Sequence, residues 1–503
     1  MRTIRVAAVF AIFLAFALAP ATAEPPFRVE VQPADLSGMP ALPGLHSFAS
    51  AKLDGYWVFV GGRLDGNHFD GPQFAWDKAN RNIWVFHLGT KRIWRIAPPP
   101  APLDHILGAA NAQHDFHEKR GKLYILGGYG ASRKNPDSAA FVTYPYLISL
   151  DVRRLVKILR RQYPGVSGSV GQVIQVPNTV LHKTLKSRKE SRVALAGGRL
   201  EYNPDEDRYY LLFGQNCTGL YCAGGQQYSF QVRSFRIFDG PNGVPQIAGY
   251  RAVTSHAVPG IPPGCADTLS QTDSGVRVEK EGEKTRVELP DGKVFEFVET
   301  EDRDSQFRRR DLNAAPIRVP GDGSRSRAGV AAYGGVFTKT GGIFGYAYLN
   351  PIYVAPGSAP VIDSFEQRLS HDETALLPVY DSAAGDMHTV FFGGLSLYVH
   401  ENGAFRCDVA IPYIDTISAL SRHRNGASEE TVLPARLPDL LGTYAVFLPA
   451  GGSLYFDNGV LDLGRLQRGQ STLVGWIYGG IKGSNQGATT ASNALLEVRV
   501  VRD

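Results

Sequence analysis

A short strand-like segment that ends in glycine recurs along this chain. In the first copy, the aromatic and β-branched run 56–60 is stopped by Gly61-Gly62. Further short strand-like segments lie between the copies, separated by turn dipeptides such as Asp54-Gly55. The pattern predicts an all-β propeller in which each four-stranded repeat forms one blade. The copies lie at 56–62, 123–128, 209–214, 328–335, 387–394 and 473–480, the third with a single glycine.

Six repeats predict six blades closed by the N-terminal strand. The sixth repeat ends at 494–500, one strand short, while the segment 27–31 is a spare strand ahead of the first repeat. Pairing these two segments would close the ring and remove an open sheet edge. A seventh blade within residues 255–305 is the alternative.

Two segments depart from the repeat. Residues 152–161 place Leu155, Ile158 and Leu159 at helical spacing, which predicts one short amphipathic helix in blade two, ahead of its fourth strand at 173–176. Residues 275–300 are charged, alternate in polarity and contain a Pro-Asp-Gly turn, which predicts an inserted hairpin or meander between blades three and four.

The first 23 residues have the pattern of a signal peptide. Arg2 and Arg5 precede the apolar run 6–19, and Ala21-Thr-Ala23 is a small-x-small cleavage sequence. The propeller is then expected to occupy 24–503. No later apolar stretch approaches about 18 residues, so no membrane span is expected after signal removal. The sequence predicts a periplasmic or secreted protein.

Four cysteines fit an oxidising compartment. Cys217 and Cys222 flank a four-residue loop, which predicts a local disulfide bond. Cys265 and Cys407 are left as a second, long-range pair. A metal pair at Cys217 and Cys222 lacks nearby ligands, so no metal is expected.

The composition argues against several classes of function. The net charge is +5, and no basic run alternates with aromatic residues, so nucleic acid is not expected as a partner. The sequence has no phosphate-binding loop, no His-Glu-x-x-His and no Gly-x-Ser-x-Gly. We therefore expect no cofactor and no nucleotide, zinc-protease or serine-hydrolase chemistry.

The repeat resembles the kelch superfamily of propellers over nearly the whole mature chain. It carries kelch-type marks at Gly61-Gly62 with Trp94, and at three further glycine pairs, 127–128, 393–394 and 479–480. The chain is most similar to exported bacterial kelch-type proteins of unassigned function, through 309–313, 387–394 and 475–480. This resemblance implies the fold and export but no particular reaction.

Two groups of kelch enzymes can be compared with this chain. Galactose-oxidase-like enzymes need a Tyr–Cys radical centre with two histidines, and no such constellation surrounds Cys265 or Cys407. Sialic acid mutarotases share the six-bladed architecture and export, but their catalytic pattern does not map onto this sequence. That likeness is an analogy of architecture only.

Ligands of propellers usually meet one mouth of the central channel, which the first strand of each blade lines. In blade four, strand alternation would place Arg309, Asp311 and Asn313 on one face. An Arg–Asp pair beside Asn could hold a carboxylate or sugar hydroxyls. The structural alternative is an ion pair that joins neighbouring blades.

Three other blades supply polar candidates at corresponding positions. They are Asn111, Gln113 and Asp115 in blade two, His371, Asp372 and Glu373 in blade five, and His46 and Arg63 in blade one. Structural polar contacts or a solvated turn would explain the same residues without a ligand.

The sequence therefore predicts a binding module for a carbohydrate, another small polar ligand or an extracytoplasmic protein at the channel mouth. The alternative is a periplasmic carbohydrate-active enzyme of mutarotase or lyase type. It would use the 309–313 and 371–373 groups for acid–base chemistry. No catalytic residue is assigned.

Overall fold

The computed structural model describes most of the chain from residue 24 onward. The described residues are 24–67, 74–98, 103–132, 141–163, 173–176, 180–183, 193–219, 226–265, 277–281, 284–288, 294–298, 304–321, 325–339, 345–484 and 489–503. The predicted signal peptide lies outside them.

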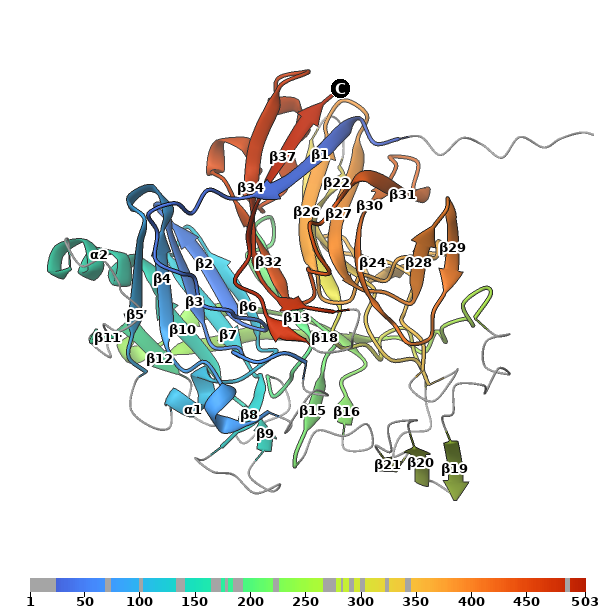
Figure 1. The fold of residues 1–503 in the computed structure, drawn as a ribbon, viewed down its shortest axis with the longest axis horizontal. Helices are drawn as coiled ribbons and strands as arrows, with labels where there is room; N and C mark the ends of the chain where they lie inside the picture. The colour runs from blue at the N-terminus through green and yellow to red at the C-terminus, as the bar shows by residue number, and fades with distance from the viewer. Residues whose placement is uncertain are drawn as a thin grey trace, which may run out of the picture.

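Six four-stranded antiparallel units form the ring, as the repeats predict (Figure 1). Blade one consists of β2 (Ala49–Leu53), β3 (Tyr56–Val60), β4 (Ile83–His87) and β5 (Arg92–Ile96). Blade two consists of β6 (Gln113–His117), β7 (Lys122–Leu126), β10 (Leu147–Asp151) and β12 (Leu181–Lys183). Blade three consists of β13 (Arg199–Asn203), β14 (Arg208–Leu212), β17 (Gln231–Asp239) and β18 (Pro245–Thr254). Blade four consists of β22 (Asn313–Pro320), β23 (Ser326–Tyr333), β24 (Ile352–Val354) and β25 (Val361–Ile362). Blade five consists of β26 (Ala375–Asp381), β27 (Asp386–Leu395), β30 (Tyr413–Arg422) and β31 (Ser428–Arg436). Blade six consists of β32 (Ala445–Pro449), β34 (Ser471–Gly479), β37 (Leu495–Arg502) and β1 (Phe27–Pro33).

Smaller elements are attached to the blades of the ring. Four two-stranded hairpins extend from the blades: β8 (Tyr129–Ala131) with β9 (Phe141–Thr143), β15 (Gln215–Cys217) with β16 (Gln226–Tyr228), β28 (Tyr398–Glu401) with β29 (Ala404–Cys407), and β35 (Ile481–Lys482) with β36 (Thr490–Ala491). Another short strand, β33 (Leu461–Asp462), pairs in parallel with β26.

The N-terminal strand closes the ring as predicted. Strand β1 pairs antiparallel with β37 in a register that runs from Phe27 opposite Arg502 to Pro33 opposite Leu496. In Figure 1 the blue β1 lies along the red β37, so the two ends of the described chain share one blade. Phe27 and Val29 are buried, and the pairing leaves β37 without an open edge.

Recurring glycines join neighbouring blades. In blade two, Gly128 N donates a 2.7 Å hydrogen bond to Leu195 O, which belongs to the loop that enters blade three. Gly127 and Gly128 have φ of 62° and 83°, and a Cβ on Gly127 would lie 2.0 Å from Leu195 O. A side chain is therefore excluded here both by conformation and by contact.

The same bond recurs around the ring. The second glycine of the motif donates to a carbonyl of the next blade in Gly62 N to Ala109 O (3.2 Å), Gly394 N to Leu441 O (2.9 Å) and Gly480 N to Leu45 O (2.8 Å). In blade three the single Gly214 donates to Arg309 O at 2.9 Å. Phe213 occupies the first glycine position with φ of 53° and packs on Phe307.

Blade two differs from the prediction in its outer strand. The segment 173–176 was expected to be the fourth strand, but β11 (Val173–Ile174) pairs in parallel with β5 of blade one. Strand β12 takes the predicted place instead. The predicted helix, α2 (Val152–Gln162), explains the change, because Leu155 and Val156 bury its apolar side in the core that blades one and two share. The chain therefore leaves the helix beside blade one.

The other predicted departure from the repeat, the insertion after blade three, is also a β-structure. Strands β19 (Arg277–Glu281), β20 (Lys284–Glu288) and β21 (Val294–Val298) form a three-stranded meander where a hairpin or meander was expected. A five-residue helix, α1 (Leu103–Leu107), was not predicted. Among the described residues, no helix is long and apolar enough to cross a membrane.

A disulfide joins Cys265 and Cys407 across 142 residues of sequence. It ties the segment that follows blade three to the β28–β29 hairpin of blade five, and it confirms the long-range pair considered from the sequence. Cys217 is buried. Its predicted partner Cys222 lies outside the described residues, so the local disulfide stays a prediction.

Candidate functional site

One residue in each blade, just before the inner strand, has a left-handed backbone. We call this set of six residues the collar. Five of its members are not glycine, and left-handed backbone costs such residues on the order of 1 kcal/mol each. The members and their φ values are Ser47 (54°), Asn111 (51°), Gly197 (67°), Asp311 (51°), Glu373 (43°) and Tyr444 (58°).

Backbone hydrogen bonds connect neighbouring members of the collar. Gly197 N donates to Asn111 O at 3.1 Å, and Asp311 N donates to Gly197 O at 2.7 Å. On the other side of the ring, Tyr444 N donates to Glu373 O at 2.6 Å. The left-handed conformation is therefore held by contacts between blades, and it places side chains of distant repeats together.

Side chains of blades two, four and six meet at the collar. The Asn111 amide nitrogen lies 3.3 Å from Asp311 Oδ1 and 3.5 Å from the Tyr444 hydroxyl. The ring of His46 lies 5.8 Å from that of Tyr444. Asn111 and Tyr444 retain some solvent exposure. The structure thus brings together three residues that were candidates from the sequence: Asn111, Asp311 and His46.

Two arginines balance part of the acidic charge at the collar. Arg199, on β13, lies 3.2 Å from Glu373 Oε1, although the two residues belong to blades three and five. Arg310 forms an ion pair with its neighbour Asp311. Asn313 joins blades four and five, because its Nδ2 donates to His371 O and its Oδ1 accepts from Thr374 N at 2.8 Å.

Buried carboxyl groups at the collar bind protons more tightly than usual. Asp372 and Glu373 are 4% and 2% exposed, and burial raises the pKa of each to about 8. Repulsion from Asp311 adds to both shifts, while Arg199 opposes the shift of Glu373. The Gly335 amide and Ser370 hydroxyl lie near the Asp372 carboxyl without reaching hydrogen-bonding geometry.

A second carboxyl pair lies next to the collar on two neighbouring inner strands. Burial raises the pKa of Asp115, on β6, to about 7. Burial and the repulsion of Asp115 raise the pKa of Glu201, on β13. Burial and the charge of Arg199 lower the pKa of His114 to about 4, so this histidine is neutral at neutral pH.

Two candidates from the sequence are structural. Both ring nitrogens of His371 are hydrogen-bonded, to Gly393 O at 2.6 Å and to Ser418 Oγ at 2.8 Å. The predicted Arg309–Asp311 pair is wrong, because both residues precede β22 in a loop, where strand alternation does not apply. Arg309 instead donates to carbonyl groups of Gln306 (2.6 Å) and Asn350 (2.8 Å).

The other candidates lie in local polar contacts. Gln113 is buried, and its amide donates to Asn111 O at 3.0 Å. Arg63 donates to both carboxylate oxygens of Asp65 at 2.8 and 2.6 Å. Burial alone would raise the pKa of Asp65, but the His46 ring, 3.9 Å away, and the hydrogen bonds from Arg63 lower it to about 2. Arg63 is therefore occupied by its own blade.

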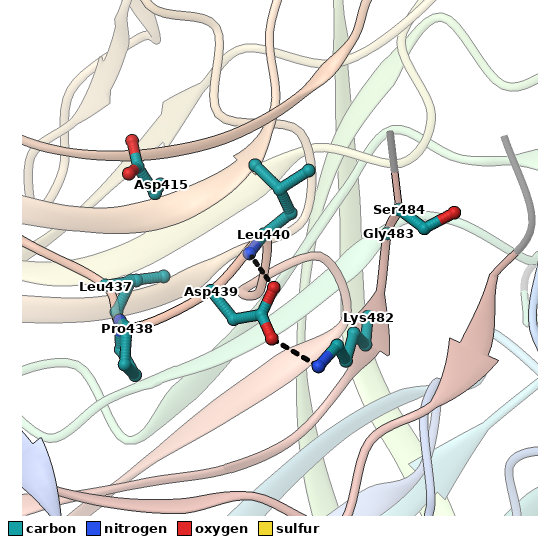
Figure 2. Close-up of a pocket in the computed structure, with 8 residues that line it drawn as sticks. All are labelled: Asp415, Leu437, Pro438, Asp439, Leu440, Lys482, Gly483 and Ser484. Atoms are coloured by element: carbon teal, nitrogen blue, oxygen red, sulfur yellow. Dashed lines mark hydrogen bonds and ion pairs between the residues drawn. The ribbon is translucent and has the colours of Figure 1, made fainter. Parts of the chain in front are cut away.

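A separate pocket of about 410 Å³ opens between blades five and six (Figure 2). Its lining includes Asp439 and Lys482, which form an ion pair, and Asp439 Oδ1 also accepts from Leu440 N at 2.9 Å. We call it the outer pocket. Its size suits a small molecule. The loop that contributes residues 437–440 to its lining continues to the collar residue Tyr444. The lining residues are Asp415, Leu437, Pro438, Asp439, Leu440, Lys482, Gly483 and Ser484.

Sequence reasoning missed Ser47, Gly197, Arg199, Glu201 and Tyr444. Aligning the residue that precedes each inner strand would have identified the collar positions, but only with the strand starts known. Within the described part of the chain, no group of three or more His, Cys, Asp or Glu residues is arranged to hold a metal ion.

Comparisons with known proteins found no matching protein family and no matching curated protein. Solved structures with similarity over nearly the whole chain include a RAG complex with one melted and one unmelted RSS (11% identity, 93% of this chain, 99% of that chain, TM-score 0.35). They also include endo-1,5-α-L-arabinanase from Thermotoga petrophila RKU-1 (8% identity, 94% of this chain, 100% of that chain, TM-score 0.19). A third is xylan β-1,4-xylosidase from Bacillus halodurans C-125 (8% identity, 93% of this chain, 89% of that chain, TM-score 0.21). The six-bladed architecture therefore rests on the strand pairing of this chain itself, and the kelch resemblance stays a prediction.

Proposed function

We propose that this protein is an exported binding module that holds a small polar ligand, of carbohydrate type, at the collar. The observation that carries the proposal is the meeting of Asn111, Asp311 and Tyr444 from three different blades. A left-handed backbone at each of these positions is costly. Such strain is typically retained where it positions functional groups, and here it directs polar side chains to one point.

Export is part of the proposal and has two supports. A buried long-range disulfide fits an oxidising compartment. The predicted signal peptide supplies the route.

The binding site can be tested with thermal shift against neutral sugars, sugar acids and amino sugars. Asn111→Gly removes the amide while keeping a residue that favours left-handed backbone, and Tyr444→Phe removes only a hydroxyl. We expect both variants to fold and to show a much smaller ligand-induced shift. Lys482→Ala, in the outer pocket, is the matched control and should keep it.

Two results would contradict the proposal. A shift that survives in Asn111→Gly and Tyr444→Phe but disappears in Lys482→Ala would place the ligand in the outer pocket. No shift with any member of the panel would argue for a protein partner instead.

A carbohydrate-active enzyme is the second candidate, and the raised pKa values of Asp372 and Glu373 favour it. A carboxyl group that keeps its proton near neutral pH can act as a general acid. Turnover of the stabilising sugar, followed by NMR, separates the two functions. For an enzyme, Asp372→Asn should abolish turnover and retain binding.

A further inference from the structure

The collar has an excess of hydrogen-bond acceptors. Several buried polar atoms there have no hydrogen-bond partner among the described residues, and those of the amide and carboxyl side chains are all oxygens. An unpaired buried acceptor is costly, so a ligand that donates hydrogen bonds gains most. The oxygens are Asn111 Oδ1, Gln113 Oε1, Asp115 Oδ2, Asp372 Oδ1 and Oδ2, and Glu373 Oε2.

The same region also has an excess of acidic groups. Five carboxyl groups face two guanidinium groups, those of Arg199 and Arg310. Burial lowers the pKa values of the three nearby histidines, His46, His114 and His371, so none adds positive charge at neutral pH. Arg63 is paired with Asp65. The five carboxyl groups are Asp115, Glu201, Asp311, Asp372 and Glu373.

Two of these carboxyl side chains are almost fully buried and have oxygens without a hydrogen-bond partner. This observation points to a ligand and does not depend on the count of charges. Asp372 has both oxygens unpartnered and Glu373 has one, at 4% and 2% exposure. With the pKa values of both near 8, protons supply the missing positive charge at neutral pH. A bound cation would replace such a proton, because an opposite charge favours the ionised carboxylate.

We infer that the ligand of the collar is a hydroxylated organic cation, an amino sugar or similar ammonium-bearing polyol, which binds in exchange for a proton of the carboxyl cluster. The inference rests on the proposed function and narrows it. Once a carboxyl group has released its proton, its oxygens only accept, and an ammonium group, which donates three hydrogen bonds and accepts none, matches them. A sugar acid would bring a second negative charge to buried carboxyl groups and is disfavoured.

Glucosamine, glucose and glucuronate test the inference, because they share one ring and differ in a single group. At pH 6.5 the amine is charged, since amines of this kind have a pKa of about 8, and the collar carboxyls still hold protons. We expect glucosamine alone to give a clear thermal shift. Titration calorimetry in phosphate and in ACES, which both buffer at this pH and differ in ionisation enthalpy, should show that protons are released on binding.

Isosteric variants locate the effect. Glu373→Gln and Asp372→Asn should each abolish part of the proton release and weaken glucosamine binding by about tenfold, the equivalent of one pKa unit of interaction. If either variant fails to fold, Asn111→Gly serves instead and should weaken binding without changing the number of protons released. Lys482→Ala should change neither quantity.

The failures of the two proposals are distinguishable. Equal or larger shifts with glucose or glucuronate, lost in Asn111→Gly, would overturn the cationic ligand and leave the proposed function standing. Glucosamine binding without proton release would also overturn the exchange. The absence of a thermal shift with all three sugars would contradict the proposed function itself.

Discussion

Arg199 of blade three and Glu373 of blade five form a 3.2 Å ion pair across 174 positions of sequence. Glu373 belongs to the collar, and Arg199 begins the inner strand that follows the collar residue Gly197. Blade four lies between these two blades in the ring. The pair therefore shows that the collar side chains approach one another closely enough for blades that are not neighbours to interact.

Replacing Gly127 by Ala should destabilise the protein by about 3 kcal/mol. The new Cβ would lie 2.0 Å from Leu195 O and at a φ of 62°. Gly403→Ala is the matched control, because its φ is 78° but no atom lies within 4 Å of the new Cβ. It should cost only about 1 kcal/mol for the backbone. Equal losses in urea unfolding would show that contact between blades is not the reason for the glycine.

Arg309→Ala should lower the free energy of unfolding by about 3–5 kcal/mol, because it leaves several buried carbonyl groups without a donor. The guanidinium donates to oxygens of Gln306, Gly334 and Asn350 and is fully buried. Chemical denaturation measures the loss. Arg28→Ala removes an exposed arginine paired with Asp503 and should change stability by less than about 0.5 kcal/mol. A mild effect at Arg309 would contradict its structural role.

His423 should make stability depend on pH. Its ring nitrogens lie 2.8 Å from Asp386 Oδ2 and 2.9 Å from Glu429 Oε1. The hydrogen bond that the His423 ring donates to Asp386 is the main reason that the pKa of His423 is raised. The protonated form is thus preferred in the folded state, so its stabilisation is complete below the unfolded pKa and is lost as pH rises through the folded one.

The comparison of wild type with His423→Gln isolates this contribution. The stability advantage of the wild type should be largest near pH 5.5 and should shrink toward pH 8.5, as measured by urea unfolding at each pH. An advantage that is constant, or that grows with pH, would contradict the assignment.

Deleting residues 24–33 should lower the melting temperature and promote aggregation. The deletion removes β1 and exposes the edge of β37, which then offers unpaired backbone groups to other chains. Thermal unfolding and light scattering measure the two effects. An unchanged melting temperature would show that closure by the N-terminal strand contributes nothing to stability.

The double variant Cys265→Ser/Cys407→Ser should lose stability, by at most about 5 kcal/mol on the chain-entropy estimate for a loop of this size. Denaturant unfolding gives the value. Mass mapping of a non-reduced digest of the wild type checks the connectivity and, in the same experiment, the predicted Cys217–Cys222 bond. Detection of a different pairing of Cys265 would refute the structure at this point.

The sequence by itself determined the ring. Alternating apolar strands, glycines that stop the second strand, and a spare strand at 27–31 opposite an incomplete sixth repeat were sufficient to predict six blades and their closure. These signals are local, because side-chain alternation and the need for a left-handed glycine act over a few residues. Helix α2 was predictable for the same reason.

Only the tertiary structure decided the site. Alternation from Arg309 was the wrong basis, because β22 begins at Asn313 and the residues before it are held by backbone contacts with Gly197 and Gly214 of blade three. Likewise, nothing local distinguishes Tyr444 from any other loop tyrosine until its hydroxyl meets Asn111. Where a loop side chain points is set by hydrogen bonds between blades far apart in sequence, and the pKa values of Asp372 and Glu373 are set by the burial that this packing creates.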